Sequence, residues 1–416
     1  MQAVLAIPGS ETLRNYGEPA DVLMRPVAGV PLLTRVLATA ARAGVDSVVV
    51  IWPKDMNPAI LESCAQSHLL KEMPVDRLVR TRAFDPRGTV DWATVAWCLE
   101  EKFLWVPWNW ATHKRALAEL PSSSFPPLTW EFPVLLQKRA VLTDVGFRVS
   151  SGRPPEGVSI TSQETVAVAE RFLVAHSGKP TDGIYSNFNR RLCWPAVRFL
   201  SHTGVTPNAL TLAGLVVAIS GAFLYARGSY ASYVAGALLF FLSGLFDEMD
   251  GMMARIKFLE SAFGTWFEGF VDNVTYLAVF AGIIVGLDRQ YGSWAVQYGS
   301  ALMIGCVLSV VVIGLQRKLA TSRDRPHEYS GRMNQLMEAD SSNLVSRVVR
   351  QIHIFVKKGV LVHYLLIFTV LGGLRVFLWL AALGSNLTWI ITLYFTRRFF
   401  QRAPLEAAVH DMPRAA

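Results

Sequence analysis

The second half of the chain contains long apolar runs without charged residues, and this feature constrains the fold more than any other. The runs begin near Leu210 and reach the length of about 20 residues that a helix needs to cross a bilayer. Of the 416 residues, 52% are hydrophobic and 17% are charged, whereas about a quarter of an average soluble protein is charged. The sequence therefore predicts an integral membrane region.

We expect six membrane-spanning helices in this region. Their ranges are Asn208–Ala226, Ser232–Gly251, Ala262–Leu287, Trp294–Gln316, Val360–Leu374 and Val376–Phe395. The fifth is short, and because Arg375 separates it from the sixth, a single bent hairpin is the alternative. Basic residues gather on one side of the spans, which predicts that this side is cytoplasmic. We expect an integral protein of the cell inner membrane, with its active site and N-terminal domain in the cytoplasm.

Residues 1–176 mix charges, prolines and short apolar runs, as soluble domains do. Ala3–Ile7 and Ser47–Trp52 predict buried parallel strands, and Pro31–Ala43 predicts the helix between them, so this is a β-α-β unit. We expect Trp130–Ser162 to complete the sheet and Gln163–Ala175 to form a helix. The predicted organisation is a soluble, Rossmann-like α/β domain over 1–176, a membrane domain over 177–402 and a tail over 403–416.

The join between these domains predicts a linker and a surface helix. Ser177–Gly183 is rich in residues that break helices. Ile184–His202 interleaves apolar side chains such as Phe188 with arginines, which favours a helix lying in the membrane interface over an ordinary solvated helix.

The net charge of +8 does not by itself indicate nucleic acid as a partner. No nucleic-acid-binding motif accompanies the basic residues, which instead lie beside apolar segments, where they set topology and meet anionic lipid headgroups. The four cysteines, Cys64, Cys98, Cys193 and Cys306, form no C-x-x-C pair. We therefore expect neither a disulfide framework nor a zinc site.

Acidic residues stand within the second and third predicted spans. Asp247 and Asp250 are three residues apart, and Glu268 and Asp272 are four apart, so each pair lies on one face of a helix. An acid at this depth costs about 2.5 kcal/mol or more unless it is paired, hydrated or bound to a cation. Carboxylate oxygens from two helices suit Mg²⁺, which keeps waters and phosphates as its other ligands. The spacing therefore predicts a functional metal site.

The full pattern around these acids is D-x2-D-G-x2-A-R-x8-G-x3-E-x3-D, running from Asp247 to Asp272. It resembles the signature of the CDP-alcohol phosphatidyltransferase family, with Glu268 in place of an aspartate. Thr206-Pro-Asn208 with Thr211, and Lys179-Pro-Thr-Asp-Gly183, are further resemblances, so the similarity covers roughly 179–402.

This resemblance implies a reaction and a role for each matching residue. A substituted phosphate group would pass from a CDP-alcohol, such as CDP-diacylglycerol or a CDP-polyol, to an alcohol or polyol-phosphate acceptor, with release of CMP.

Two Mg²⁺ (or Mn²⁺) ions would be held by Asp247, Asp250 and Glu268, with Asp272 as a further ligand or the catalytic base. Contacts with the CDP moiety would come from Asn208, Gly251, Ala254 and Arg255. Homodimers are common in the family. For an acceptor phosphate, the candidate cations are Lys179, Arg190, Arg191, Arg317 and Lys318, which serve equally well as topology signals.

The start of the chain resembles the sugar nucleotidyltransferase family, in which a glycine-rich loop follows the first strand. Here the loop Pro8–Arg14 has one glycine, Arg25 stands where a lysine is usual, and Phe103–Asn109 lacks the metal-binding carboxylate of that family. We therefore expect an inactive domain. The alternatives are a bifunctional enzyme that both makes and consumes a CDP-polyol, and a membrane pseudoenzyme or transporter whose acids form an ion path.

Overall fold

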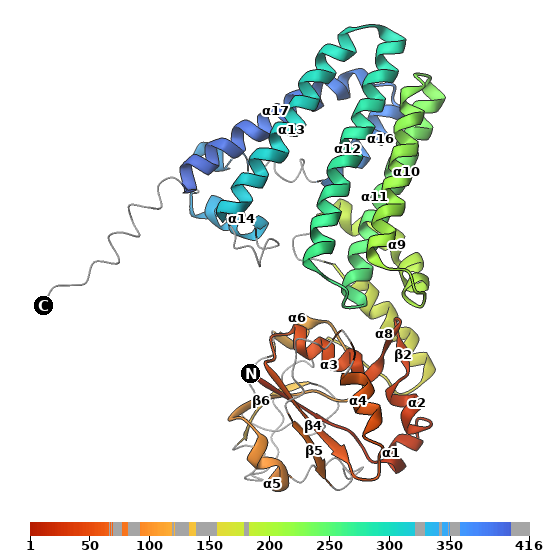
Figure 1. Ribbon diagram of the computed structural model, residues 1–416, viewed down its shortest axis with the longest axis vertical. Coiled ribbons are helices and arrows are strands. Elements are labelled where there is room, and N and C mark those ends of the chain that lie inside the picture. Colours follow the sequence, from red (N-terminus) through yellow and green to blue (C-terminus); the bar gives the residue numbers. More distant parts are fainter. Residues whose placement is uncertain are drawn as a thin grey trace, which may run out of the picture. The chain divides into compact units, whose positions relative to one another are not determined.

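The computed structural model describes residues 1–65, 67, 69, 77–81, 92–118, 120, 133–138, 156–178, 183–320, 329–340, 343–347, 349 and 358–400 (Figure 1). The chain forms two compact units. The α/β unit comprises Met1–Pro180, Arg191–Val205 and Gly251–Leu259, and the helical unit comprises Thr181–Arg190, Thr206–Asp250 and Glu260–Ala416. Two short segments that come later in the chain, Arg191–Val205 and Gly251–Leu259, thus belong to the α/β unit.

The α/β unit is built on a five-stranded sheet with the order β5-β4-β1-β6-β8. Its strands are β1 (Gln2–Ala6), β4 (Ser47–Pro53), β5 (Arg77–Thr81), β6 (Lys102–Trp105) and β8 (Val134–Gln137). The first four are parallel, and β8 runs antiparallel to β6. The predicted β-α-β unit is confirmed, with α3 (Leu32–Arg42) between β1 and β4. The sheet is mixed, so the Rossmann-like arrangement is not confirmed.

Both faces of this sheet are buried, because the strands carry apolar side chains on both of their alternating faces. In β1, Ala3 and Leu5 belong to one hydrophobic cluster, whereas Val4 and Ala6 belong to another. Successive side chains of a strand point to opposite faces, so an uninterrupted apolar run fits a strand covered on both sides. Of the stretch expected to complete the sheet, β8 does so as an antiparallel edge strand, and 139–155 lie outside the described residues.

Shorter elements surround the sheet. They are α1 (Ser10–Arg14), α2 (Pro19–Leu23), β2 (Pro26–Val27), β3 (Val30–Pro31), α4 (Ala59–Ala65), α5 (Trp92–Val95), β7 (Trp110–Ala111), α6 (Lys114–Ala118) and β9 (Val158–Ser159). Helix α8 (Gln163–Ala175) has the predicted bounds, and the side chain of Ser162 caps its N-terminus by accepting from the backbone N–H of Thr165.

The helical unit contains five described helices that are long and apolar enough to cross a membrane. They are α10 (Pro207–Ala226), α11 (Tyr230–Ile256), α12 (Ala262–Tyr291), α13 (Trp294–Ala320) and α17 (Leu374–Phe400). The shorter described helices of this unit include α14 (Tyr329–Ala339) and α16 (Lys358–Val370), while α9 (Ile184–Ser201) begins in the helical unit and ends in the α/β unit.

The predicted fifth span, Val360–Leu374, is not confirmed, because α16 has 13 residues. At 1.5 Å per residue this is about 20 Å, short of the roughly 30 Å of a bilayer core. The helix stops before Gly372, which has a φ of 70°, and this left-handed conformation ends a helix readily at glycine. Arg375, which left the division of the last two spans open, lies in the first turn of α17.

Helices α10 and α12 approach each other through two glycines four residues apart. A methyl group at Gly282 would lie 2.2 Å from the carbonyl oxygen of Ala222, and one at Gly286 would lie 2.1 Å from that of Tyr225. Neither position accepts a side chain without moving a backbone. Small residues at this spacing let membrane helices pack closely, and here they fix α12 against α10.

Candidate active site

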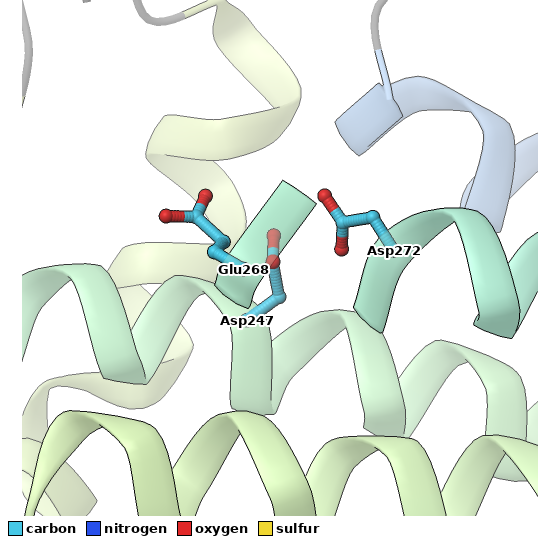
Figure 2. A group of neighbouring side chains, drawn as sticks. All are labelled: Asp247, Glu268 and Asp272. Carbon is cyan, nitrogen blue, oxygen red and sulfur yellow. The ribbon is translucent and has the colours of Figure 1, made fainter. Parts of the chain in front are cut away.

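The acids of the sequence pattern lie on two neighbouring helices. Asp247 belongs to α11, and Glu268 and Asp272 belong to α12. One carboxylate oxygen from each residue can be chosen so that all three lie within 4.8 Å of one another (Figure 2). Among the described residues this is the single group of three or more His, Cys, Asp or Glu side chains that is arranged in this way. The three side chains are half-buried.

Asp250 stands apart from this group. Its side chain is 4% exposed, and its Oδ2 accepts a hydrogen bond of 2.5 Å from the hydroxyl of Thr211 on α10. The i, i+3 spacing places Asp250 on the same face of α11 as Asp247, and the structure adds the hydroxyl partner. Its role as a metal ligand stays a prediction.

The residues expected to contact CDP continue α11 beyond Asp250. A methyl group at Gly251 would lie 3.3 Å from the guanidinium nitrogens of Arg255, one turn further along. Arg255 donates from Nε to the carbonyl oxygen of Ser177. Ala254 is half-buried. Asn208, in the first turn of α10, has its Oδ1 3.6 Å from where a methyl group at Gly264 would stand, so it lies beside the start of α12.

A cavity opens beside the acids. Its polar lining includes Asn189, Thr211, Asp247, Asp250 and Asp272. The rest of the lining consists of Gly214, Leu215, Phe240, Ser243, Gly244, Glu248, Val271, Thr275, Tyr276 and Val362. Binding sites for small molecules typically combine apolar walls with a few polar groups that converge on the ligand, and this cavity has that composition.

The cavity lining includes a residue that no sequence pattern indicated. Asn189 of α9 is 1% exposed, and its Oδ1 has no hydrogen-bond partner among the described residues. Its neighbour Arg190 forms an ion pair of 2.9 Å with Glu248, and both side chains are largely buried. Arg190 was expected to be a topology signal or an acceptor-binding cation. In the sequence, Asn189 and Arg190 are adjacent polar residues of an amphipathic helix. That pattern does not show which of the two side chains faces the acids.

The other candidate cations for an acceptor phosphate are dispersed. Arg191 and Lys318 are exposed, and the guanidinium of Arg317 lies 5.4 Å from the ring centre of Tyr329. Lys179 is outside the described residues. The acceptor site therefore stays a prediction.

Comparison with known families identifies the domain that contains these acids. Residues 204–390 match the sequence model of the CDP-alcohol phosphatidyltransferase family. These residues form a domain of that family. The domain is a transferase domain, and it contains all of the half-buried acids described above together with Asp250 and Asn208.

Curated relatives of this transferase domain are named as synthases, and one of them is also named as a transferase. A phosphatidylinositol phosphate synthase of Streptomyces avermitilis is 27% identical over 60% of this chain and 96% of its own length. A bifunctional IPC transferase and DIPP synthase of Aquifex aeolicus is 24% identical over 57% of this chain, which spans 50% of that protein. An archaetidylinositol phosphate synthase of Methanothermobacter thermautotrophicus is 35% identical over 24% of this chain and 49% of its own.

Proposed function

We propose that the protein is an integral membrane enzyme that transfers a substituted phosphate group from a CDP-alcohol to an acceptor alcohol and releases CMP. The observation that carries the proposal is the group of three carboxylates, from two helices of a CDP-alcohol phosphatidyltransferase domain, within 4.8 Å of one another. We further propose that the reaction requires Mg²⁺ or Mn²⁺ and that the site faces the cytoplasm.

The residues present fit such cations. Three carboxylates so close together repel one another unless a cation or a proton lies among them. Carboxylate oxygens are the hard ligands that Mg²⁺ prefers, and Mg²⁺ usually keeps several waters and substrate phosphates as its other ligands. Asp247, Glu268 and Asp272 would hold the ions, with Asp250 contributing from the adjacent turn. When bound, the ions would offset the negative charge that builds on the CMP leaving group.

The proposed step balances as a displacement at phosphorus. The acceptor hydroxyl oxygen forms a bond to the β-phosphorus of the CDP-alcohol, and the bond between that phosphorus and the bridging oxygen breaks, so that CMP leaves. The proton of the hydroxyl passes to Asp272, which is half-buried at the edge of the cavity and acts as the general base. Gly251 and Ala254 lack bulky side chains, so the cytidine diphosphate would be able to approach α11 closely at these positions.

The relatives suggest which acceptor to try first. Their names point to phosphatidylinositol phosphate and archaetidylinositol phosphate as products, so we propose an acceptor of the polyol-phosphate class and a lipid-linked donor. Such an acceptor is water-soluble and anionic. It would enter from the side of the membrane where basic residues gather.

The test is CMP release by the purified full-length protein in lipid nanodiscs. CDP-diacylglycerol and a CDP-polyol are offered in turn with inositol phosphate and with other polyol phosphates. We expect CMP release that requires both the acceptor and Mg²⁺, stops with EDTA, and falls at least a hundredfold in Asp272→Asn. Activity that survives EDTA would exclude the metal-dependent reaction. Mg²⁺-dependent binding of labelled CDP, measured in parallel, would separate an enzyme offered the wrong acceptor from a transporter.

A further inference from the structure

The turn between the two acid-bearing helices is built into the α/β unit. Helix α11 ends at Ile256 and α12 begins at Ala262, with Ser261 as its N-cap. The segment Gly251–Leu259, which contains the last turn of α11 and most of the connection, is part of the α/β unit. The connection is short, so whatever fixes it also constrains the helices on either side.

The connection holds a conformation that its own residues do not favour. Phe258 has a φ of 58°, in the left-handed region that is usually left to glycine. The backbone N–H of Leu259 donates to the carbonyl of Ala254 at 2.8 Å, which is the closing bond of a Schellman motif. A bulky residue keeps such a conformation only when its surroundings determine it. The Phe258 ring packs against the main hydrophobic cluster of the α/β unit.

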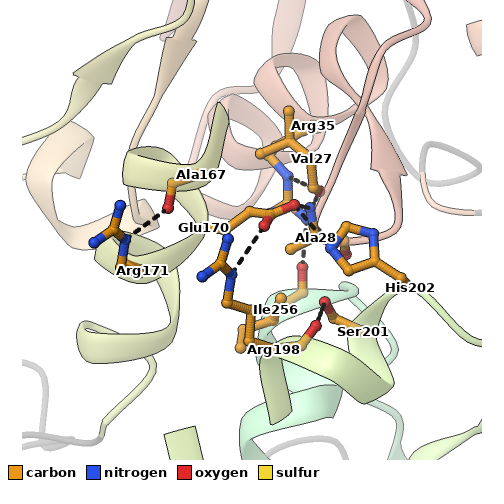
Figure 3. Close-up of polar contacts among 10 residues, drawn as sticks. All are labelled: Val27, Ala28, Arg35, Ala167, Glu170, Arg171, Arg198, Ser201, His202 and Ile256. Atoms are coloured by element: carbon orange, nitrogen blue, oxygen red, sulfur yellow. Dashed lines mark hydrogen bonds and ion pairs between the residues drawn. The ribbon is translucent and has the colours of Figure 1, made fainter. Parts of the chain in front are cut away.

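Arg35 of α3 supplies the polar part of this anchor. It is 1% exposed, donates to Val27 O at 3.0 and 2.8 Å, and donates to Ile256 O at 3.0 Å (Figure 3). Its guanidinium lies 5.2 Å from the ring centre of Phe258, and Arg42 donates to Phe258 O at 3.2 Å. The last carbonyls of a helix lack partners within the helix and carry partial negative charge, so two guanidinium groups stabilise this end of α11.

Glu170 of α8 balances the charge of the anchor. It is buried, accepts from the backbone N–H of Ala28 at 3.1 Å, and pairs with Arg198 at 3.3 Å and His202 at 2.9 Å (Figure 3). Burial lowers the pKa of Arg35 to about 9, and Glu170 opposes this shift. The guanidinium is therefore charged at neutral pH and needs the carbonyl partners that it has.

We propose that the α/β unit serves as the anchor of the α11–α12 turn, and that Arg35 is a positioning residue for the carboxylates on these helices. Ile256 lies six positions after Asp250 on the same helix, which is about 9 Å along the axis. Releasing this end lets α11 move relative to α12, and the acids of one helix then lose their spacing from those of the other. The proposal rests on the proposed function, because it assumes that Asp247, Glu268 and Asp272 bind divalent cations together.

The test compares full-length variants that differ in the anchor. Arg35→Gln removes the charge and shortens the reach, Arg35→Lys keeps the charge but lacks the forked donors, and Leu104→Ala is the control. Leu104 is a buried residue of β6 in the same hydrophobic cluster, so its truncation destabilises the unit without removing a group that donates to α11. Mn²⁺ affinity is measured by electron paramagnetic resonance, and CMP release is measured against Mg²⁺ concentration.

We expect Arg35→Gln to bind Mn²⁺ at least tenfold more weakly and to need correspondingly more Mg²⁺ for half-maximal rate, with Arg35→Lys in between. Leu104→Ala should lower the Tm and leave both metal constants unchanged. A lower Tm in Arg35→Gln with wild-type metal constants would show a merely structural role and overturn the proposal. If Arg35→Gln does not fold, Phe258→Ala carries the same test.

Hydrogen exchange of the backbone amides tests the anchor even if the proposed function is wrong. If the wild type neither binds Mn²⁺ nor releases CMP, the proposed function fails, and the anchor is judged from the exchange of amides 251–259. Faster exchange there in Arg35→Gln than in Leu104→Ala supports the anchor. Equal exchange in the two variants rejects it.

Discussion

The helical unit and the α/β unit of this chain use their polar side chains in opposite ways. On α11 and α12, three carboxylates converge within 4.8 Å of one another. After β6 in the α/β unit, Asn109 stands where the sugar nucleotidyltransferases have a carboxylate, and its buried amide donates to Ser159 Oγ at 2.9 Å and Ile160 O at 3.3 Å. The acids on α11 and α12 converge on one another, whereas the amide of Asn109 forms hydrogen bonds that stabilise the fold.

The same difference extends to the other polar residues of the α/β unit. Arg25, where that family has a lysine, donates to the carbonyl oxygen of Tyr16 at 3.1 Å. Arg35 and Glu170 bind backbone groups and the ends of helices. Within the described part of this unit, no three metal-ligating side chains gather as the helical acids do. These described polar side chains of the α/β unit stabilise its fold, and the following variants test this contrast.

The largest effect is expected at the converging acids. Asp247→Asn keeps the shape of the side chain but removes the charge from one of three grouped ligands, so CMP release should fall at least a hundredfold, because the cation loses a hard anionic ligand. Asp288→Asn is the matched control, since Asp288 lies on α12 about 24 Å from Asp272 along the axis. Rates are measured at saturating Mg²⁺.

Equal losses in Asp247→Asn and Asp288→Asn would show that net acidity of the helices matters and that the geometry of the group does not. Retained CMP release in Asp247→Asn would exclude Asp247 as an essential metal ligand and overturn the metal site built on the grouped acids.

Glu268 gives the next effect, because it is the one departure from the family's aspartates. Glutamate keeps the charge and both oxygens and adds one methylene, while Mg²⁺ demands near-octahedral geometry at about 2.0–2.1 Å. Its carboxylate nevertheless reaches the group. We expect Glu268→Gln to weaken Mg²⁺-dependent CDP binding at least tenfold and Glu268→Asp to retain part of it. Wild-type binding in Glu268→Gln would favour the pseudoenzyme interpretation.

Asn109→Asp tests the supporting region. It restores the carboxylate of the nucleotidyltransferases, yet we expect no pyrophosphate release from CTP and a polyol phosphate, because the loop Pro8–Arg14 still has one glycine. Loss of the donors to Ser159 and Ile160 should lower the free energy of unfolding by about 1–3 kcal/mol, measured by urea denaturation. Pyrophosphate release by the wild type would revive the bifunctional alternative.

Local patterns were sufficient for much of the fold. The apolar strands and α8 appeared where short-range signals placed them, because β-strand alternation and helix capping act over a few residues. The break between α16 and α17 lies close to the division predicted at Arg375, but the short length of α16 was not predicted, since a Gly-Gly pair gives no indication of where the helix before it begins. The contact from Arg35 to Ile256 joins residues 221 positions apart, and no periodic pattern encodes it.

The site was predictable to the extent that helical spacing determines it. The i, i+4 relation put Glu268 and Asp272 on one face of α12, and the motif put Asp247 opposite. The spacing could not show that Thr211 would bond to Asp250, because that contact depends on how α10 packs against α11. Asn189 lies on α9. The alternation of apolar and basic residues in α9 predicts an interfacial helix but does not indicate which residue lines the cavity.

The smallest effect is expected at Asn189, where the supporting and catalytic uses of a polar group can be told apart. A buried amide oxygen without a partner is unfavourable by about 1–3 kcal/mol, so a purely structural asparagine would have found one. Its position beside Asp247 and Thr211 in the cavity suggests that a hydroxyl or amino group of the CDP-alcohol supplies the missing donor. Asn189→Ala should therefore raise the KM for the donor roughly three- to tenfold, with little change in kcat. Its Tm should stay the same or rise, because the unpaired group is gone.

Asn187→Ala, an exposed position of the same helix, is the control and should change neither the KM nor the Tm. A lower Tm with an unchanged KM would place Asn189 with Asn109 among the residues that hold the fold, and the cavity would then need another residue to recognise the donor.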